Sequence, residues 1–178
     1  MSGTLIVIYG PPLAGKTTLA WALARTFPTK TAVVSSDQLR AGAIAVPDPD
    51  AIAELALVHV QLRLLVANYL KNGYDVVVEG AYLFEVGGER RSLETEVDQL
   101  LALMRHLAPK RVAVRLTAPA AELRQRALAT GRDAESEAAV RLSEAYGPRV
   151  GPGSLTFDSA AQRPSEIAAA ITTALAGA

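Results

Sequence analysis

The chain has 178 residues, of which 50% are hydrophobic, and this length fits one domain with a sizeable core. Its 18 basic and 18 acidic residues balance, so the composition provides no strongly cationic surface for non-specific binding to nucleic acid. The absence of cysteine excludes disulfides, thiolate catalysis and cysteine-ligated metals. No apolar run is long enough to cross a membrane and the first residues lack a basic signal region, so we expect a cytoplasmic protein without a membrane partner.

Short apolar segments alternate with helical patterns along the chain. The expected strands are residues 5–9, 31–35, 76–78, 111–116 and 155–157, and helices are expected to begin near residues 16, 52, 93, 119 and 164. Buried strands that alternate with helices predict an α/β fold: three layers around a doubly wound parallel sheet of five strands. A turn at residues 87–88 is expected to precede a helix that begins with Arg90 and Arg91.

One motif carries recognisable chemistry. Residues 10–17 match G-x-x-x-x-G-K-[ST] between a buried strand and a helix, the context that a phosphate-binding loop requires. In such a loop the backbone N–H groups and the positive helix end surround the phosphates, Lys16 reaches the β and γ oxygens, and the Thr17 hydroxyl binds Mg²⁺. The sequence therefore predicts a site for ATP and Mg²⁺. The expected nucleotide-binding residues of the loop are Gly10, Pro11, Pro12, Leu13, Ala14, Gly15, Lys16, Thr17 and Thr18.

A second group of polar residues follows the strand at 31–35. Asp37 and Arg40 come at the carboxyl end of that strand, on the side of the sheet where the phosphate loop lies. Asp37 would orient and deprotonate an acceptor hydroxyl, and Arg40 would neutralise phosphate or substrate charge. The alternatives are that Asp37 caps the turn that starts at Gln38, and that Arg40 is a surface residue.

Two further residues follow the third strand. Glu79 would hold the water shell of Mg²⁺ or a substrate hydroxyl, with a capping or structural role as the alternative. Tyr82, at the same edge of the sheet, would form a wall of the acceptor pocket.

A polar segment at residues 131–153, with glycine and proline at its far end, is expected to form a short mobile lid. Transfer of a phosphoryl group needs a cation that closes over the developing charge. Arg126 and Arg132 are the candidates for that cation, and a solvated basic face is the alternative.

The order of these features resembles the small P-loop kinases related to chloramphenicol phosphotransferase and to the kinase domain of phage polynucleotide kinase. The resemblance runs over nearly the whole chain: the phosphate loop, Ser-x-Asp-x-x-Arg at residues 35–40, an apolar strand ending in an acid, and an arginine-bearing lid. Residues 72–80 are similar to the zeta-toxin kinases. The resemblance implies an adenylate-kinase-like sheet with the phosphate-loop strand in its centre. It also implies Asp37 as the general base, Asp158 at the adenine or ribose, and Arg90 near the acceptor.

The sequence thus predicts a single P-loop kinase domain over residues 1–178, which transfers the γ-phosphoryl group of ATP to a hydroxyl. Lys16, Asp37, Arg126 and Arg132 are the predicted catalytic residues. The neutral charge and the short lid favour a small-molecule acceptor such as an antibiotic, a sugar or a nucleotide sugar. A polynucleotide 5′-hydroxyl is the alternative acceptor, and a module that binds or hydrolyses ATP without any acceptor is the alternative class. No oligomeric state is predicted.

Overall fold

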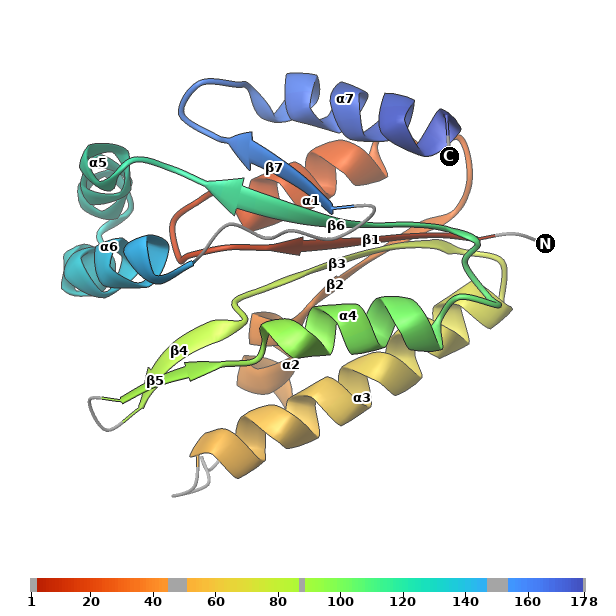
Figure 1. The fold of residues 1–178 in the computed structure, drawn as a ribbon, viewed down its shortest axis with the longest axis horizontal. Coiled ribbons are helices and arrows are strands. Elements are labelled where there is room, and N and C mark those ends of the chain that lie inside the picture. Colours follow the sequence, from red (N-terminus) through yellow and green to blue (C-terminus); the bar gives the residue numbers. More distant parts are fainter. Residues whose placement is uncertain (1–2, 45–50, 87–88, 147–153, 178) are drawn as a thin grey trace.

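The computed structural model describes residues 3–44, 51–86, 89–146 and 154–177, which fold around one parallel sheet (Figure 1). The sheet contains β1 (Thr4–Tyr9), β2 (Thr31–Ser35), β3 (Asp75–Gly80), β6 (Lys110–Thr117) and β7 (Ser154–Asp158). Their order is β2-β3-β1-β6-β7, and every neighbouring pair is parallel. The predicted five-stranded parallel α/β fold, with the phosphate-loop strand in the centre, is confirmed.

Helices cover both faces of the sheet. α1 (Lys16–Ala24) and α7 (Pro164–Ala176) lie on one face, and α3 (Ala51–Lys71) and α4 (Glu94–Leu103) lie on the other (Figure 1). Side chains of β1 alternate between the two layers, so that Val7 packs toward α3 and α4 whereas Ile8 packs toward α1 and α7. A strand buried on both faces reads as a continuous apolar run, which is why β1 could be predicted from its sequence.

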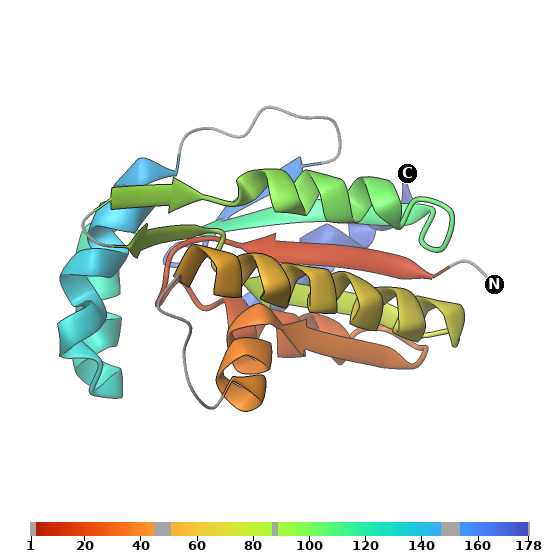
Figure 2. The same ribbon diagram turned by 90° about the horizontal axis from the view of Figure 1, so that it is seen from below.

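The remaining elements gather at the carboxyl ends of the strands. α2 (Ser36–Ala43) follows β2, while α5 (Ala120–Thr130), η1 (Asp133–Glu135) and α6 (Ser136–Ala145) follow β6 (Figure 2). A small apolar cluster joins α5 to α6 and consists of Ala118, Leu123, Ala139 and Val140. Because ligands of open parallel sheets bind at the carboxyl edge, these elements frame the expected site.

The segment after β3 differs from the prediction. β4 (Leu83–Val86) and β5 (Glu89–Ser92) form an antiparallel hairpin, and α4 begins only at Glu94. Arg90 and Arg91 therefore lie in a strand and do not begin a helix. The predicted turn at residues 87–88 lies outside the described residues.

The predicted lid also differs in part. Residues 136–145 form α6, whose Ala139, Val140 and Leu142 are buried, so this stretch is a packed helix and not a polar flap. The far end of the predicted lid, residues 147–153, lies outside the described residues. Among the described helices, none is both long and apolar enough to cross a membrane.

Candidate active site

A cavity of about 1060 Å³ opens at the carboxyl edge of the sheet. Pockets for one drug-sized ligand span about 300–1,000 Å³, so this cavity has room for two reactants. It brings together most of the predicted site residues: Pro12, Leu13, Ala14, Gly15, Lys16, Thr17, Thr18, Asp37, Arg40, Glu79, Arg126 and Arg132.

The phosphate loop forms one wall of the cavity. α1 begins at Lys16 directly after Gly15, and no side chain caps its N-terminus. The first N–H groups of a helix have no intrahelical partner, and the helix dipole makes this end positive. Leu13 adopts a left-handed φ of 65°, a strained conformation that functional loops often contain. The uncapped helix end and the Lys16 ammonium fit a polyphosphate.

Gly10 fixes the path by which the loop leaves β1. Its φ is 148°, and a Cβ at this position would lie 2.1 Å from the carbonyl oxygen of Leu116 on β6. A side chain would therefore push the loop away from the neighbouring strand, which explains the glycine at the first position of the motif.

Lys16 lies below the loop with its side chain buried. Its Nζ donates a hydrogen bond to the Pro11 carbonyl at 2.9 Å. Burial lowers the pKa of Lys16, and the carboxylates of Asp37 and Glu79 oppose this shift. The loop cation is thus within electrostatic reach of both predicted acids.

Asp37 lies in the first turn of α2, exposed to the cavity. Ser35 is the residue that caps this helix, because its side chain accepts a hydrogen bond from the Gln38 N–H at 3.2 Å. The alternative role of Asp37 as a cap is therefore wrong. Ser36 donates a hydrogen bond from Oγ to the Asp37 carboxylate at 3.4 Å.

Glu79 lies in β3, almost fully buried, and lines the same cavity. In the β2–β3 register it is paired with Ser35, the last residue of β2. A Cβ on the following Gly80 would lie 2.0 Å from the Ser36 hydroxyl oxygen, so α2 starts directly against the end of β3. This close approach brings the first turn of α2, which carries Asp37, to the end of β3, and both acids line the cavity.

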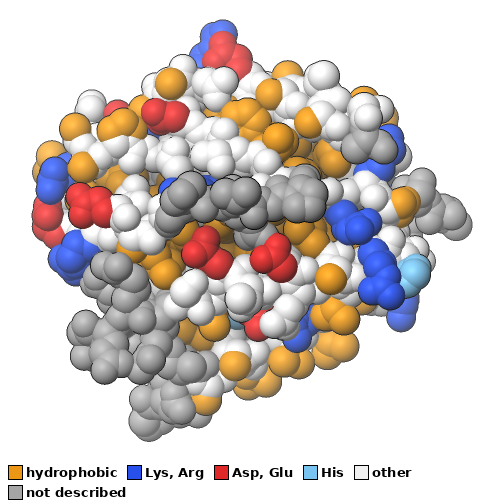
Figure 3. Space-filling view, in the orientation of Figure 1, with side chains coloured by type: hydrophobic (Ala, Val, Ile, Leu, Met, Phe, Trp, Pro, Cys, Tyr) orange, Lys and Arg blue, Asp and Glu red, His pale blue; other side chains and the backbone are white. Residues whose placement is uncertain are grey.

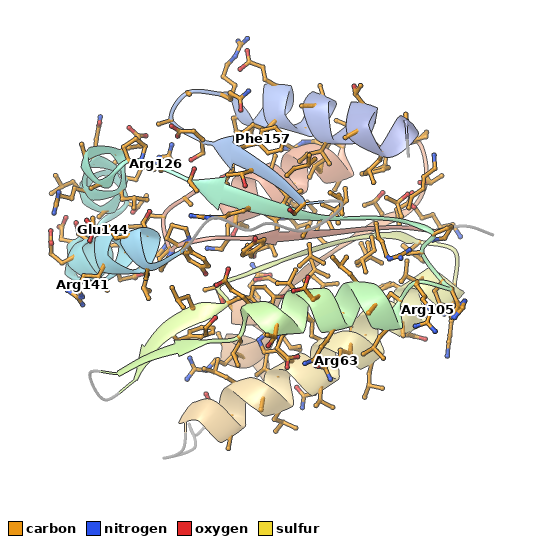
Figure 4. The ribbon with its side chains drawn as sticks, in the orientation of Figure 1. Arg63, Arg105, Arg126, Arg141, Glu144 and Phe157 are labelled. Carbon is orange, nitrogen blue, oxygen red and sulfur yellow. The ribbon has the colours of Figure 1, made fainter. Side chains whose placement is uncertain are left out.

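Arg126 lies between α5 and the sheet, as labelled in Figure 4. Its guanidinium donates to Glu122 at 2.7 Å, to the Leu13 carbonyl at 3.2 Å, and to Ser159 Oγ and O at 2.9 Å each. Arg126 therefore joins the phosphate loop to the β7–α7 connection.

Arg132 follows Gly131, where α5 ends, and forms an ion pair with Glu135. The Glu135 carboxylate chiefly raises the pKa of Arg132, and Asp37 adds to that shift. Arg132 in turn contributes to lowering the pKa of Lys16. Arg132 lines the same cavity, within electrostatic reach of Asp37 and Lys16.

Tyr82 and Asp158 are two predicted residues that do not line this cavity. Tyr82 is fully buried in the core, where its ring contacts Tyr9 and His59, so its predicted place in a pocket wall is wrong. Asp158 ends β7 and accepts a hydrogen bond from the Ala160 N–H at 2.8 Å, as an ordinary turn residue does. The side chain of Arg90 lies outside the described part of the chain.

The comparisons with known proteins agree with this arrangement. A family model described as an AAA domain matches residues 5–145. The chain belongs to this family. Among curated proteins, no sequence matches this AAA-domain protein.

Solved structures share the fold of the AAA-domain protein along nearly its whole length. APS kinase from Mycobacterium tuberculosis, in complex with AMPPNP and APS, has a TM-score of 0.70 at 17% identity, and 99% of each chain is covered. A sugar kinase from Janibacter has a TM-score of 0.64 at 16% identity, covering 96% of this chain and 93% of its own. The tunicamycin resistance protein of Deinococcus radiodurans has a TM-score of 0.62 at 15% identity, covering 97% and 95%. The expected resemblance to small P-loop kinases is confirmed.

The AAA-domain protein also has cavity residues that the sequence did not reveal. Ser159 lines the cavity beside Arg126, and Leu55, Leu83, Phe84 and Leu142 form apolar parts of its wall. Leu55 lies on the apolar stripe of α3 and could have been found from that pattern. Ser159 carries no sequence signal, because a serine after a strand is an ordinary loop residue.

Proposed function

We propose that this protein transfers the γ-phosphoryl group of ATP, in the presence of Mg²⁺, to a hydroxyl group of a small molecule. The observation that carries the proposal is one cavity in which the loop cation Lys16 faces two carboxylates, Asp37 and Glu79. A cation for phosphate and a carboxylate for the acceptor proton are the two groups that phosphoryl transfer to an alcohol requires.

The nucleotide would occupy the side of the cavity formed by residues 10–18. The uncapped end of α1 and Lys16 would bind its phosphates, and Arg126 with Ser159 would bound the site beyond them. Thr17 and Glu79 would hold Mg²⁺, which supplies charge neutralisation for the triphosphate when bound.

In the proposed reaction the acceptor oxygen attacks the γ-phosphorus. The bond from the γ-phosphorus to the β-bridging oxygen breaks, ADP leaves, and the hydroxyl proton passes to the Asp37 carboxylate. Arg132 would stabilise the charge on the phosphoryl group as it transfers.

The neighbouring structures support a small-molecule acceptor, since they include kinases of APS and of a sugar and a protein of tunicamycin resistance. The ion pairs of α5, η1 and α6 also favour a small-molecule acceptor over a nucleic acid. Arg124 pairs with Glu137 and Arg132 with Glu135, so basic and acidic side chains lie side by side at the left end of Figure 3. A nucleic-acid site would favour unpaired cations that displace counterions.

The test is transfer of label from γ-labelled MgATP, offered in parallel a 5′-hydroxyl oligonucleotide, a pool of alcohol-bearing small molecules, and no acceptor. The proposal predicts label in the small-molecule pool. Label on the oligonucleotide would make this a polynucleotide kinase. Steady ATP hydrolysis with no labelled acceptor would instead indicate a module that binds or hydrolyses ATP.

A further inference from the structure

The part of the cavity that faces the phosphate loop has a mainly apolar wall. This wall consists of Leu55 from α3, Ala81, Leu83 and Phe84 from the segment that runs from β3 into β4, and Leu142 from α6. Asp37, Glu79 and Arg40 are among the charged residues that line the same cavity. An acceptor bound beside these residues would meet a hydrophobic surface, the carboxylates of Asp37 and Glu79, and the guanidinium of Arg40.

Arg40 is already engaged by a buried acid. Its guanidinium donates from Nε to Glu54 Oε1 on α3, and the Glu54 side chain is 3% exposed while that of Arg40 is 40% exposed. A buried carboxylate needs partners that neutralise it, and Arg40 is one such partner of Glu54. Drawing Arg40 toward a bound anion would weaken this compensation.

We propose that Glu54 is a specificity-determining residue: by holding Arg40 it closes the acceptor side to anions, so the acceptor is an uncharged or cationic alcohol with an apolar body. This inference rests on the proposed function. Asp37 and Glu79 line the cavity together with Arg40, whose guanidinium is already paired with the buried Glu54. A carboxylate, phosphate or sulfate on the acceptor would meet like charge, and like-charge contact suppresses binding of the wrong partner.

The first experiment separates the acceptor by charge. A pool of alcohol-bearing metabolites and antibiotics is divided on an anion exchanger at pH 7, and the unretained part is divided again by reversed-phase chromatography. Each fraction is offered to the full chain with γ-labelled MgATP. We expect label in the fraction that passes the anion exchanger and is retained by the apolar phase. Label confined to the anionic fraction would overturn the inference and leave the proposed kinase intact, whereas label in no fraction would overturn the kinase and the inference with it.

Substitution of Glu54 tests its role directly. Glu54→Gln frees the Arg40 guanidinium, so transfer into the anionic fraction relative to the neutral fraction should rise at least about fivefold. Glu96→Gln is the matched control, because it breaks the Arg63–Glu96 ion pair between α3 and α4, away from the cavity (Figure 4). The ratio should be unchanged in this control.

The double variant Arg40→Gln/Glu54→Gln removes both charges and should lose the gain in anionic acceptors. It also covers the case in which Glu54→Gln alone folds poorly, since it leaves no unpaired cation. A purely structural role for Glu54 would lower transfer to both fractions equally. An unchanged ratio in Glu54→Gln, or the same gain in the double variant, would overturn the assignment.

Discussion

Arg126 donates two hydrogen bonds to Ser159, one to the hydroxyl and one to the carbonyl, both at 2.9 Å. With its further bond to the Leu13 carbonyl, this arginine ties α5 to the phosphate loop and to the start of the β7–α7 connection. Arg132, only six positions further along, pairs with Glu135 and lies within electrostatic reach of Asp37 and Lys16. The two arginines predicted as equivalent candidates therefore occupy different parts of the cavity.

Substituting each arginine by methionine should separate these roles. Arg132→Met should lower kcat by about 10²–10³-fold with little change in ATP affinity, because it removes a cation from the transferring group. Arg126→Met should instead weaken ATP binding and lower the melting temperature, because α5, the phosphate loop and the β7–α7 connection lose the side chain that joins them. Steady-state kinetics and ATP titrations measure both effects, with Arg141→Met on α6 as the control. Equal kcat losses in both variants would contradict the division of roles.

Nucleotide affinity should depend on pH through Lys16. Burial lowers the pKa of this lysine, so in the free protein it loses its proton at a lower pH than the usual 10.5. Only the protonated form attracts phosphate, so ATP affinity should fall as pH rises, earlier than an exposed lysine would allow. Titrations of Lys16→Met should show weak binding with no such fall. A pH dependence retained in Lys16→Met would assign the titration to another group.

Gly10 and Gly42 provide a matched pair of glycines. Gly10→Ala places a Cβ 2.1 Å from the Leu116 carbonyl oxygen at a φ of 148°, and should lower the free energy of unfolding by more than about 2 kcal/mol. Gly42 lies in α2 with no atom within 4 Å of a built Cβ. Gly42→Ala should raise the free energy of unfolding by about 0.4–1 kcal/mol. Urea unfolding measures both, and a similar change in the two variants would contradict the predicted clash.

Stability should fall in mild acid through His59. Burial is the main cause that lowers the pKa of this histidine below the usual 6.5, so the unfolded chain binds its proton at a higher pH than the folded chain. Between these two pKa values the unfolded state holds more protons, and acidification therefore favours unfolding. His59→Gln should flatten the decline in the free energy of unfolding below pH 6.5. His106→Gln, at the exposed second histidine, should keep the wild-type decline. Identical profiles in both variants would remove His59 as the cause.

The central strands β1 and β3 could be predicted because they are buried on both faces, and the phosphate loop because its spacing is fixed by backbone geometry. The β4–β5 hairpin could not, since β5 reads Glu-Arg-Arg-Ser and lacks the apolar alternation of a strand. α6 could not be predicted either, because its buried residues Ala139 and Val140 are small and have charged residues on both sides in the sequence.

Within the site, residues near a strand end could be predicted and side-chain directions could not. Asp37 and Glu79 follow from the rule that carboxyl ends meet at one edge. Tyr82 does not, because Ala81 and Leu83 on either side of it line the cavity while its own ring points into the core. Glu54 and Ser159 act through partners far away in the sequence, and no local pattern reveals such contacts.

The most direct test of the central claim is phosphoryl transfer by Asp37→Asn, measured together with ATP affinity. The account predicts that transfer to the acceptor falls by at least about 100-fold while ATP binds as before, because the amide keeps the shape of the side chain but cannot take the hydroxyl proton. Asp98→Asn, an exposed position on α4, is the matched control and should keep full transfer. Undiminished transfer in Asp37→Asn would contradict the account, since the acceptor proton would then have another destination.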